Sequence, residues 1–282
     1  SLALAFAACG PAIGQPLGDK PGYLWGGLSS VANRQAIDVM VWAHGLDDGY
    51  VPQGIAHSGA SVLMSAYKSV DPKVGTGPCR VFAVSTVSGK PSGYFDMPED
   101  CGHAGGLAMI DADTLVVADT RTLYKIDLRR ALEARHAAPA LLSVVRLGGL
   151  VKGSFIDFDG KDLWVGSSEN SPDKARAFRL SLQVFAPVGT SATVTEAAAL
   201  SSIPIPTEAN GMAFDAKGVM WVAASNSKFG ALYRVSPSSG EVLARHDMVI
   251  GIEDLSFDPQ GGLWSVSEAG SRRWSTWRQT FP

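Results

Sequence analysis

A short phrase recurs five times along this chain of 282 residues, and it constrains the fold more than any other feature. In the clearest copy, residues 208–225, an apolar run leads into a turn containing Asp215 and Gly218, and a second apolar run follows. This pattern is typical of two short antiparallel strands joined by a tight turn. With Met220 as the reference residue, one register fits all five copies without a gap. The reference residues are Leu63, Leu115, Leu163, Met220 and Leu263.

The spacing of the copies predicts an all-β propeller. The residues ten positions before the reference, called here the ten-back residues, are Gln53, Gly105, Gly153, Asn210 and Glu253. They recur at intervals of roughly 40–60 residues, and each interval holds segments for about four strands, which is the signature of propeller blades.

The copy count favours five blades, and six remain an alternative. The last copy has three strand-like segments, the third at residues 272–279, and residues 36–43 near the N-terminus also read as a strand. If this N-terminal strand completes the C-terminal blade, the ring closes and two exposed sheet edges disappear. Residues 31–282 then form a single propeller domain, preceded by a lead-in at residues 1–30.

Composition and charge narrow the classes of partner. The chain is 46% hydrophobic, with a formal net charge of −3, so it can bury a core but carries no basic surface for nucleic acid. Outside the first residues, nothing approaches the ~20 apolar residues of a membrane span. We expect a monomer that binds a small-molecule substrate or a ligand of the cell envelope.

The first nine residues are small and apolar and end at Cys9. They resemble the tail of a bacterial secretion signal, with Cys9 as the lipid-bearing residue of a lipoprotein. An ordinary signal tail or a disordered start is the alternative. We therefore expect export to the periplasm, the cell surface or the medium, with membrane contact only through a lipid on Cys9.

Two further cysteines, Cys79 and Cys101, precede strand-like segments in neighbouring copies. An exported compartment permits a disulfide between them, which we expect in preference to a thiol nucleophile or a metal pair. Three cysteines are too few for an all-thiolate zinc site, which takes four.

The first strand of each propeller blade lines the central channel, so the ten-back residues and their neighbours point to one mouth. The polar residues expected there are Gln53, His103, Glu208, Asn210, Glu253 and Asp254, with Lys152 nearby. Carboxylate and amide oxygens are ligands that Ca²⁺ prefers. Without a cation, mutual repulsion raises the pKa of a carboxyl group and prepares a general base. The alternative is that these residues are hydrogen-bonded to one another and hold the blades together.

The phrase at residues 208–225 resembles the Asn-Gly blade motif of the SMP-30/gluconolactonase-like propellers and their strictosidine-synthase-like relatives. The similarity spans about residues 51–268. In that family an early acid, the Asn of the Asn-Gly pair and a late Asp hold a divalent cation, which polarises a lactone or ester carbonyl. The resemblance assigns metal ligation to Asn210 and the late acidic position to Glu253 and Asp254. The early acid falls at Gln53, an amide, and the family ring has six blades.

The resulting prediction is a metal-dependent hydrolase of a small lactone or ester, with calcium as the expected cation. Glu253, Asp254 and His103 are the predicted catalytic residues. Glu208, Gln53 and Lys152 are predicted to bind substrate, and Asn210, Glu253 and Gln53 to bind the metal. One alternative is a non-catalytic envelope propeller that binds a glycan, peptide or protein. Another is metal-free chemistry by a carboxyl pair, Glu208 and Glu253, as in glycosidases.

Overall fold

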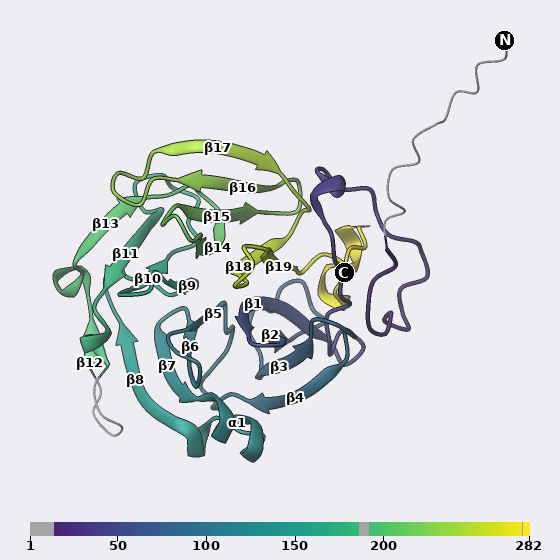
Figure 1. Ribbon diagram of the computed structural model, residues 1–282, viewed down its shortest axis with the longest axis horizontal. Helices are drawn as coiled ribbons and strands as arrows, with labels where there is room; N and C mark the ends of the chain where they lie inside the picture. Colours follow the sequence, from purple (N-terminus) through teal and green to yellow (C-terminus); the bar gives the residue numbers. More distant parts are fainter. Residues whose placement is uncertain (1–13, 186–191, 278) are drawn as a thin grey trace, which may run out of the picture.

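Four sheets of four or five strands and one sheet of two strands surround a common centre (Figure 1). The computed structural model describes residues 14–185, 192–277 and 279–282. Blade 1 contains β1 (Tyr50–Ser58), β2 (Ser61–Lys68), β3 (Cys79–Ser85) and β4 (Pro91–Asp96). Blade 2 contains β5 (Gly106–Met109), β6 (Thr114–Asp119), β7 (Thr122–Asp127), β8 (Leu141–Leu147) and β12 (Ala192–Val194). Blade 3 contains β9 (Phe155–Phe158), β10 (Leu163–Gly166), β11 (Arg176–Leu180) and β13 (Ser201–Pro204). Blade 4 contains β14 (Ala209–Phe214), β15 (Met220–Ser225), β16 (Gly230–Val235) and β17 (Val242–Asp247). The fifth sheet contains β18 (Ile252–Phe257) and β19 (Leu263–Ser267).

Helical segments are short and lie outside the sheets. Helix α1 (Leu128–Ala134) follows β7, and the Asp127 side chain caps it by accepting a hydrogen bond from the backbone N–H of Arg130 at 2.9 Å. Single 3₁₀ segments occur at Arg34–Ala36, Ala138–Ala140, Leu182–Val184, Glu196–Ala198 and Arg272–Trp277. Within the described ranges, no helix is long and apolar enough to cross a membrane.

The innermost strands β1, β5, β9, β14 and β18 approach one another closely (Figure 1). Glycine permits this approach at two points. A Cβ on Gly106 would lie 2.6 Å from the backbone nitrogen of Ile156, and one on Gly211 would lie 2.4 Å from the Cα of Asp254. Larger residues at these positions would push neighbouring sheets apart, which accounts for the glycines in the repeated phrase.

Apolar side chains fill the space between each pair of neighbouring sheets. One buried cluster joins blades 1 and 2, another blades 2 and 3, and a third blades 3 and 4. Two more clusters join the fifth sheet to blade 4 and to blade 1. The core is therefore divided into wedges between sheets, as expected for a propeller.

The turn between the first two strands is built in the same way in three sheets. An Asp at the start of the turn accepts a hydrogen bond from the indole N–H of a Trp on the second strand. The pairs are Asp159–Trp164 at 2.8 Å, Asp215–Trp221 at 3.2 Å and Asp258–Trp264 at 3.1 Å. Each bond fixes one indole ring against the neighbouring sheet.

The all-β propeller prediction is confirmed, but the five-blade count is not, because four blades are complete and the fifth sheet has two strands. The segment expected as its third strand instead forms the 3₁₀ segment Arg272–Trp277. The rings of Trp274 and Trp277 stack there at 4.7 Å. The backbone of Trp274 is itself non-helical and kinks the segment, so the alternation of faces expected for a strand does not apply to these two residues.

The predicted closure by residues 36–43 is likewise not found. These residues form no named strand, and the backbone pairing described for them is an isolated bridge between Leu17 and Val41. The segment nevertheless lies between blades 4 and 1. Met40 packs in the cluster shared with blade 4, and Val41 packs against the cluster of blade 1. Its apolar residues therefore cover the fifth sheet without extending it.

Replacing Gly211 with alanine is expected to lower the free energy of unfolding by about 1–3 kcal/mol, because the added methyl group overlaps the backbone of β18. Urea unfolding measures this change. Gly27→Ala is the matched control, since no atom lies within 4 Å of a Cβ built there. Equal stability of the two variants would contradict the close approach of β14 and β18.

Candidate functional site

Three of the five ten-back residues lie at irregularities in the pairing of first and second strands. The register shifts between Pro52 and Ile55 in β1, between Ala209 and Gly211 in β14, and between Ile252 and Leu255 in β18. A bulge adds a residue to one strand and redirects its side chain, and bulges are enriched beside active sites. Gln53, Asn210 and Glu253 therefore occupy equivalent places in three sheets.

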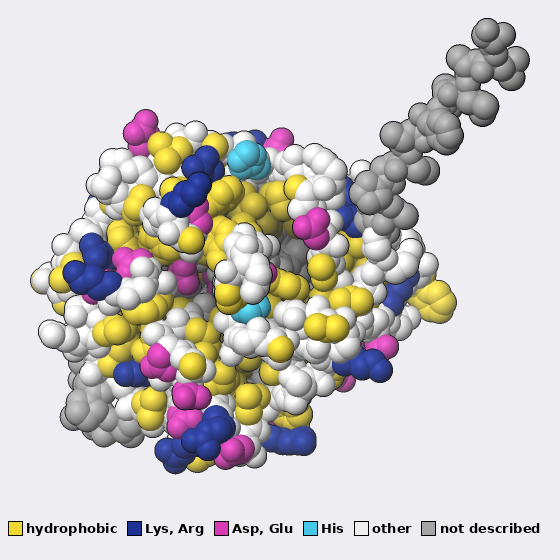
Figure 2. Space-filling view, viewed as in Figure 1, with side chains coloured by type: hydrophobic (Ala, Val, Ile, Leu, Met, Phe, Trp, Pro, Cys, Tyr) yellow, Lys and Arg dark blue, Asp and Glu magenta, His cyan; other side chains and the backbone are white. Residues whose placement is uncertain are grey.

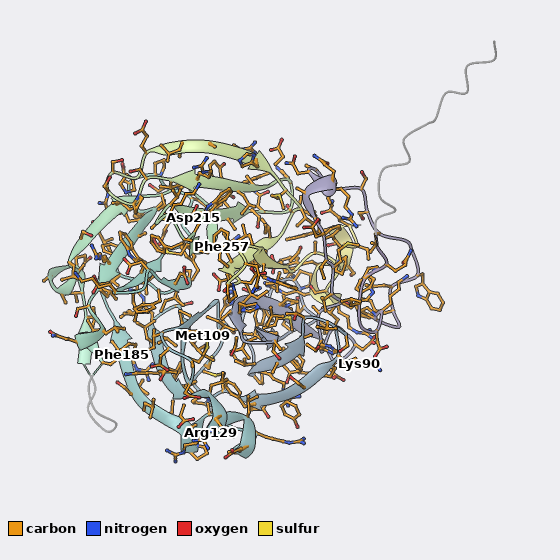
Figure 3. The ribbon with its side chains drawn as sticks, viewed as in Figure 1. Lys90, Met109, Arg129, Phe185, Asp215 and Phe257 are labelled. Atoms are coloured by element: carbon orange, nitrogen blue, oxygen red, sulfur yellow. The ribbon has the colours of Figure 1, made fainter. Side chains whose placement is uncertain are left out.

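Two of these residues, Gln53 and Glu253, gather with Glu268, which follows β19; together we call them the acid cluster. The side-chain amide of Gln53 donates a hydrogen bond to Oε2 of Glu268 at 3.4 Å and one to the Pro52 carbonyl at 2.7 Å. Gln53 and Glu253 are both buried. Side-chain oxygen atoms crowd the region where β1 meets β18 and β19 (Figure 3).

The carboxyl groups of the acid cluster hold their protons far more tightly than exposed acids. Burial raises the pKa of Glu268 to about 7. Burial also raises the pKa of Glu253 well above its usual range, and the neighbouring charges of Glu268 and Asp254 raise it further. At neutral pH Glu268 is therefore partly protonated.

Arg273, the cation whose charge acts on the acid cluster, donates its hydrogen bonds to other groups. Its guanidinium donates to the hydroxyl of Tyr67 and to the backbone carbonyls of Asp71 and Pro72, the last two at 3.3 and 3.2 Å. Its charge lowers the pKa of Glu253 and Glu268 only as a smaller effect than burial. The two glutamates are thus close to a positive charge but not neutralised by it.

Tyr67 connects the acid cluster to His103. The two rings stack at 4.7 Å, and nearby carboxylates, after burial itself, raise the pKa of the Tyr67 hydroxyl. Nδ1 of His103 lies 2.8 Å from the Gly75 carbonyl, which accepts only, so Nδ1 carries the proton. Burial lowers the pKa of His103, so the ring is neutral and its Nε2 is an acceptor.

Asp254 occupies the central axis. Its Oδ2 accepts hydrogen bonds from the backbone N–H groups of Ile55 at 3.2 Å and Leu107 at 3.0 Å, which belong to two other sheets. Its Oδ1 is buried and has no hydrogen-bond partner in the described chain. Burial raises the pKa of this carboxyl well above its usual range. Asp254 therefore joins sheets through one oxygen and presents the other, unpartnered, in the interior.

Three other predicted site residues have polar partners outside the acid cluster. The Asn210 carbonyl oxygen accepts from Ser168 at 3.0 Å, and its amide donates to the Ser225 hydroxyl at 3.0 Å. The Glu208 carboxylate accepts a hydrogen bond from the Asn226 side chain at 2.9 Å, and Lys152 forms an ion pair with Glu169. The bond between Ser168 and Asn210 links blades 3 and 4, and the other pairs lie within one blade, so none of these residues is paired with Glu253.

A calcium site at the channel fits this arrangement poorly. The Asn210 oxygen already accepts a hydrogen bond from Ser168, which a bound cation would have to displace or share. In the described residues, three His, Cys, Asp or Glu donor atoms come within 4.8 Å of one another at Cys79, Cys101 and Asp119, and not around Glu253. Calcium binding stays an untested prediction, and no chemistry below depends on it.

The expected disulfide between Cys79 and Cys101 is wrong for this structure, in which both thiols are free and buried. The Cys79 thiol faces the Gly77 carbonyl at 3.5 Å. Asp119 orders the loop at Cys101 by accepting backbone N–H groups, with Oδ1 bonded to His103 at 2.6 Å. The spacing predicted the proximity of the two cysteines but carries no information on whether their side chains bond. Cys9 lies outside the described residues.

Sequence reasoning missed Tyr67, Glu268 and Arg273. A signal for two of them was present, because the second strand runs antiparallel to the first and its end lies beside the ten-back residue. Tyr67 and Glu268 stand four and five positions after their reference residues. Arg273 follows in a 3₁₀ segment that resembled a strand, so no comparable signal marked it.

No protein-family profile matches the chain, and no curated protein matches it in sequence. Among solved structures, the crystal structure of Myxococcus xanthus glutaminyl cyclase aligns with a TM-score of 0.54 and 13% identity, over 78% of this chain and 86% of that chain. The PQQ-bound aldose sugar dehydrogenase from Streptomyces coelicolor aligns with a TM-score of 0.46 and 13% identity, over 77% and 74% of the two chains. A glucose dehydrogenase aligns with a TM-score of 0.46 and 13% identity, over 80% of each of the two chains. At 13% identity the similarity to the glutaminyl cyclase supports the propeller fold alone. None of these comparisons supports the SMP-30 family in particular.

The raised pKa of Glu268 predicts a pH dependence of stability. Between pH 4.5 and about 7 the folded protein keeps a proton that the unfolded chain has released, so the free energy of unfolding falls as pH rises through this range. Glu268→Gln removes this effect. The variant should gain about 1–3 kcal/mol relative to the parent on going from pH 5 to pH 8. Urea unfolding at both pH values tests this, with exposed Glu241→Gln as control; a pH-independent difference would refute it.

Proposed function

We propose that the protein is an enzyme that catalyses acyl transfer at the amide or ester carbonyl of a small polar substrate, with the acid cluster as its proton-transfer group. One observation carries the proposal. Glu253 is buried and its neighbour Glu268 is half-buried, and in the described structure neither carboxyl group forms an ion pair with Arg273.

Such an arrangement reduces the stability of the folded state. Burying a carboxyl without a compensating charge is costly, and replacement by apolar groups of similar size is often stabilising. Strongly shifted acids of this kind are concentrated at functional sites, where the shifted pKa serves the reaction. The unpartnered Oδ1 of Asp254 adds another unsatisfied polar atom to the same interior region.

The proposed mechanism assigns one role to each group. Glu268, with a pKa of about 7, accepts the proton of the attacking amine, alcohol or water as the nucleophile adds to the carbonyl carbon. The Tyr67 hydroxyl accepts a hydrogen bond from Arg273, so its own hydrogen is available to the carbonyl oxygen as negative charge develops there. Glu268 then returns the proton to the leaving nitrogen or oxygen, and the carbonyl re-forms as that bond breaks.

Both an amide and an ester substrate fit this scheme. Hydrolysis of a small lactone or ester, which the sequence resemblance implied, uses water as nucleophile. Ring closure of a glutaminyl group, which the name of one structural neighbour describes, uses an amine within the same molecule and releases ammonia. In this proposal the carboxyl groups perform either reaction without a step on a cation.

A substrate panel tests the proposal. Glutaminyl peptides assayed by ammonia release, dihydrocoumarin and p-nitrophenyl acetate represent the amide, lactone and ester classes. For the substrate that is turned over, Glu268→Gln should lower kcat about 10²–10⁴-fold. The parent enzyme should lose activity on the acid side with an apparent pKa near 7, because the base must be deprotonated.

Controls separate catalysis from the non-catalytic alternative. Glu241→Gln, an exposed change of the same chemistry, should leave kcat unchanged, and a chelator should have no effect. Activity that survives in Glu268→Gln would exclude the proposed base, whereas activity abolished by chelator would restore the metal-dependent hydrolase. No turnover of any class would favour an envelope-binding propeller. Export and a lipid on Cys9 remain predictions.

A further inference from the structure

The fifth sheet ends after two strands, whereas every other sheet has four or five. β19 pairs with β18 on one side, and in the described chain no strand pairs with its other edge. A cavity of about 720 Å³ lies at this edge. Binding sites for small molecules typically enclose about 300–1,000 Å³, so the space left by the outer strands has the size of a ligand site.

The walls of this cavity come from three sheets and are apolar. The wall residues used below are Val62 and Met64 of β2, Trp221 of β15, Leu232 of β16, and Trp264 and Val266 of β19. The space-filling view shows a hollow beside the centre that is bordered largely by hydrophobic side chains (Figure 2).

The N-terminal segment closes the remaining side. Residues 36–43 line the cavity, and they pack into both adjoining apolar clusters through Met40 and Val41. The segment is held by hydrogen bonds to Leu17, whose N–H donates to the Met40 carbonyl at 2.8 Å and whose carbonyl accepts from Trp42 at 3.0 Å. It therefore covers the cavity without occupying the edge of β19.

The polar groups of the walls are mostly engaged in the fold. Asp258 accepts hydrogen bonds from the backbone N–H groups of Gln260 and Gly262 and from the Trp264 indole. Ser267 donates to the Ile250 carbonyl at 3.0 Å. Ser265 donates to the Asp254 carbonyl at 2.9 Å. A charged ligand would find few partners, whereas the free backbone edge of β19 offers one or two hydrogen bonds along an apolar surface.

We propose that this cavity binds a small, uncharged and largely apolar molecule, which packs against the apolar walls that include the indole rings of Trp221 and Trp264. Small-molecule sites are lined mostly by hydrophobic and aromatic side chains with a few polar groups, as this cavity is. The hydrogen bonds from Asp215 and Asp258 hold the two indoles in place, so the site is formed before the ligand arrives. The site is separate from the acid cluster and does not depend on the proposed acyl transfer.

Fluorescence titration with N-phenyl-1-naphthylamine, an uncharged aromatic probe, tests the proposal on the 282-residue chain. Saturable binding at one site per chain is expected, together with a rise in the melting temperature. Val62→Phe fills part of the cavity and should weaken binding at least tenfold. Val242→Phe, the same substitution at an exposed position of β17, should leave the affinity unchanged.

The outcomes are decisive in either direction. Absence of saturable binding to the parent protein, or equal affinity in Val62→Phe and the parent, overturns the proposal. Far-ultraviolet circular dichroism establishes that each variant is folded, since an unfolded chain also binds such probes. If Val62→Phe does not fold, Val266→Phe, at another residue of the cavity wall, replaces it, and the same tenfold loss is required.

Discussion

Contact between the inner strands is the constraint on which the rest of this propeller depends. Strands of different sheets do not pair there, so their backbone groups need other partners. One buried carboxyl, Asp254 of β18, supplies them by accepting N–H groups from Ile55 and Leu107. Asp157 of blade 3 does the same for Phe214 of blade 4 at 2.8 Å. The acids at the centre are therefore part of the architecture, whatever chemistry they also perform.

That arrangement concentrates negative charge where solvent is excluded. Burial raises the pKa of Asp157 to about 7, as it does for Glu268, so at neutral pH protons partly replace absent counter-charges. Asp157 uses its oxygens for backbone N–H groups, which is a structural role. Glu268 lies half-buried after the last strand and has few such bonds. Its burial and raised pKa therefore do not serve to satisfy backbone N–H groups, as those of Asp157 do. This difference between two similar acids is what favours a chemical role for Glu268.

The repeated phrase predicted the second strands correctly, because alternation of apolar residues and turn residues reports local structure. Each reference residue lies in a second strand, from Leu63 in β2 to Leu263 in β19. The phrase also located Gln53 and Glu253 at the centre, but the bulges that redirect them depend on tertiary contacts. The strand-like residues 36–43 and the pair Trp274 and Trp277 were misread, since short apolar runs fit more than one conformation.

The contact between β1 and β18 at the axis affects how the molecule reaches its native state. The hydrogen bond between Ile55 and Asp254 spans 199 residues of sequence. Loop closure on this scale is entropically unfavourable until other contacts form, and such long-range contacts slow folding. During synthesis, blades 1 to 4 can assemble against one another as they emerge. The central carboxyl belongs to β18, so the ring cannot be completed until β18 has followed blades 1 to 4 out of the ribosome.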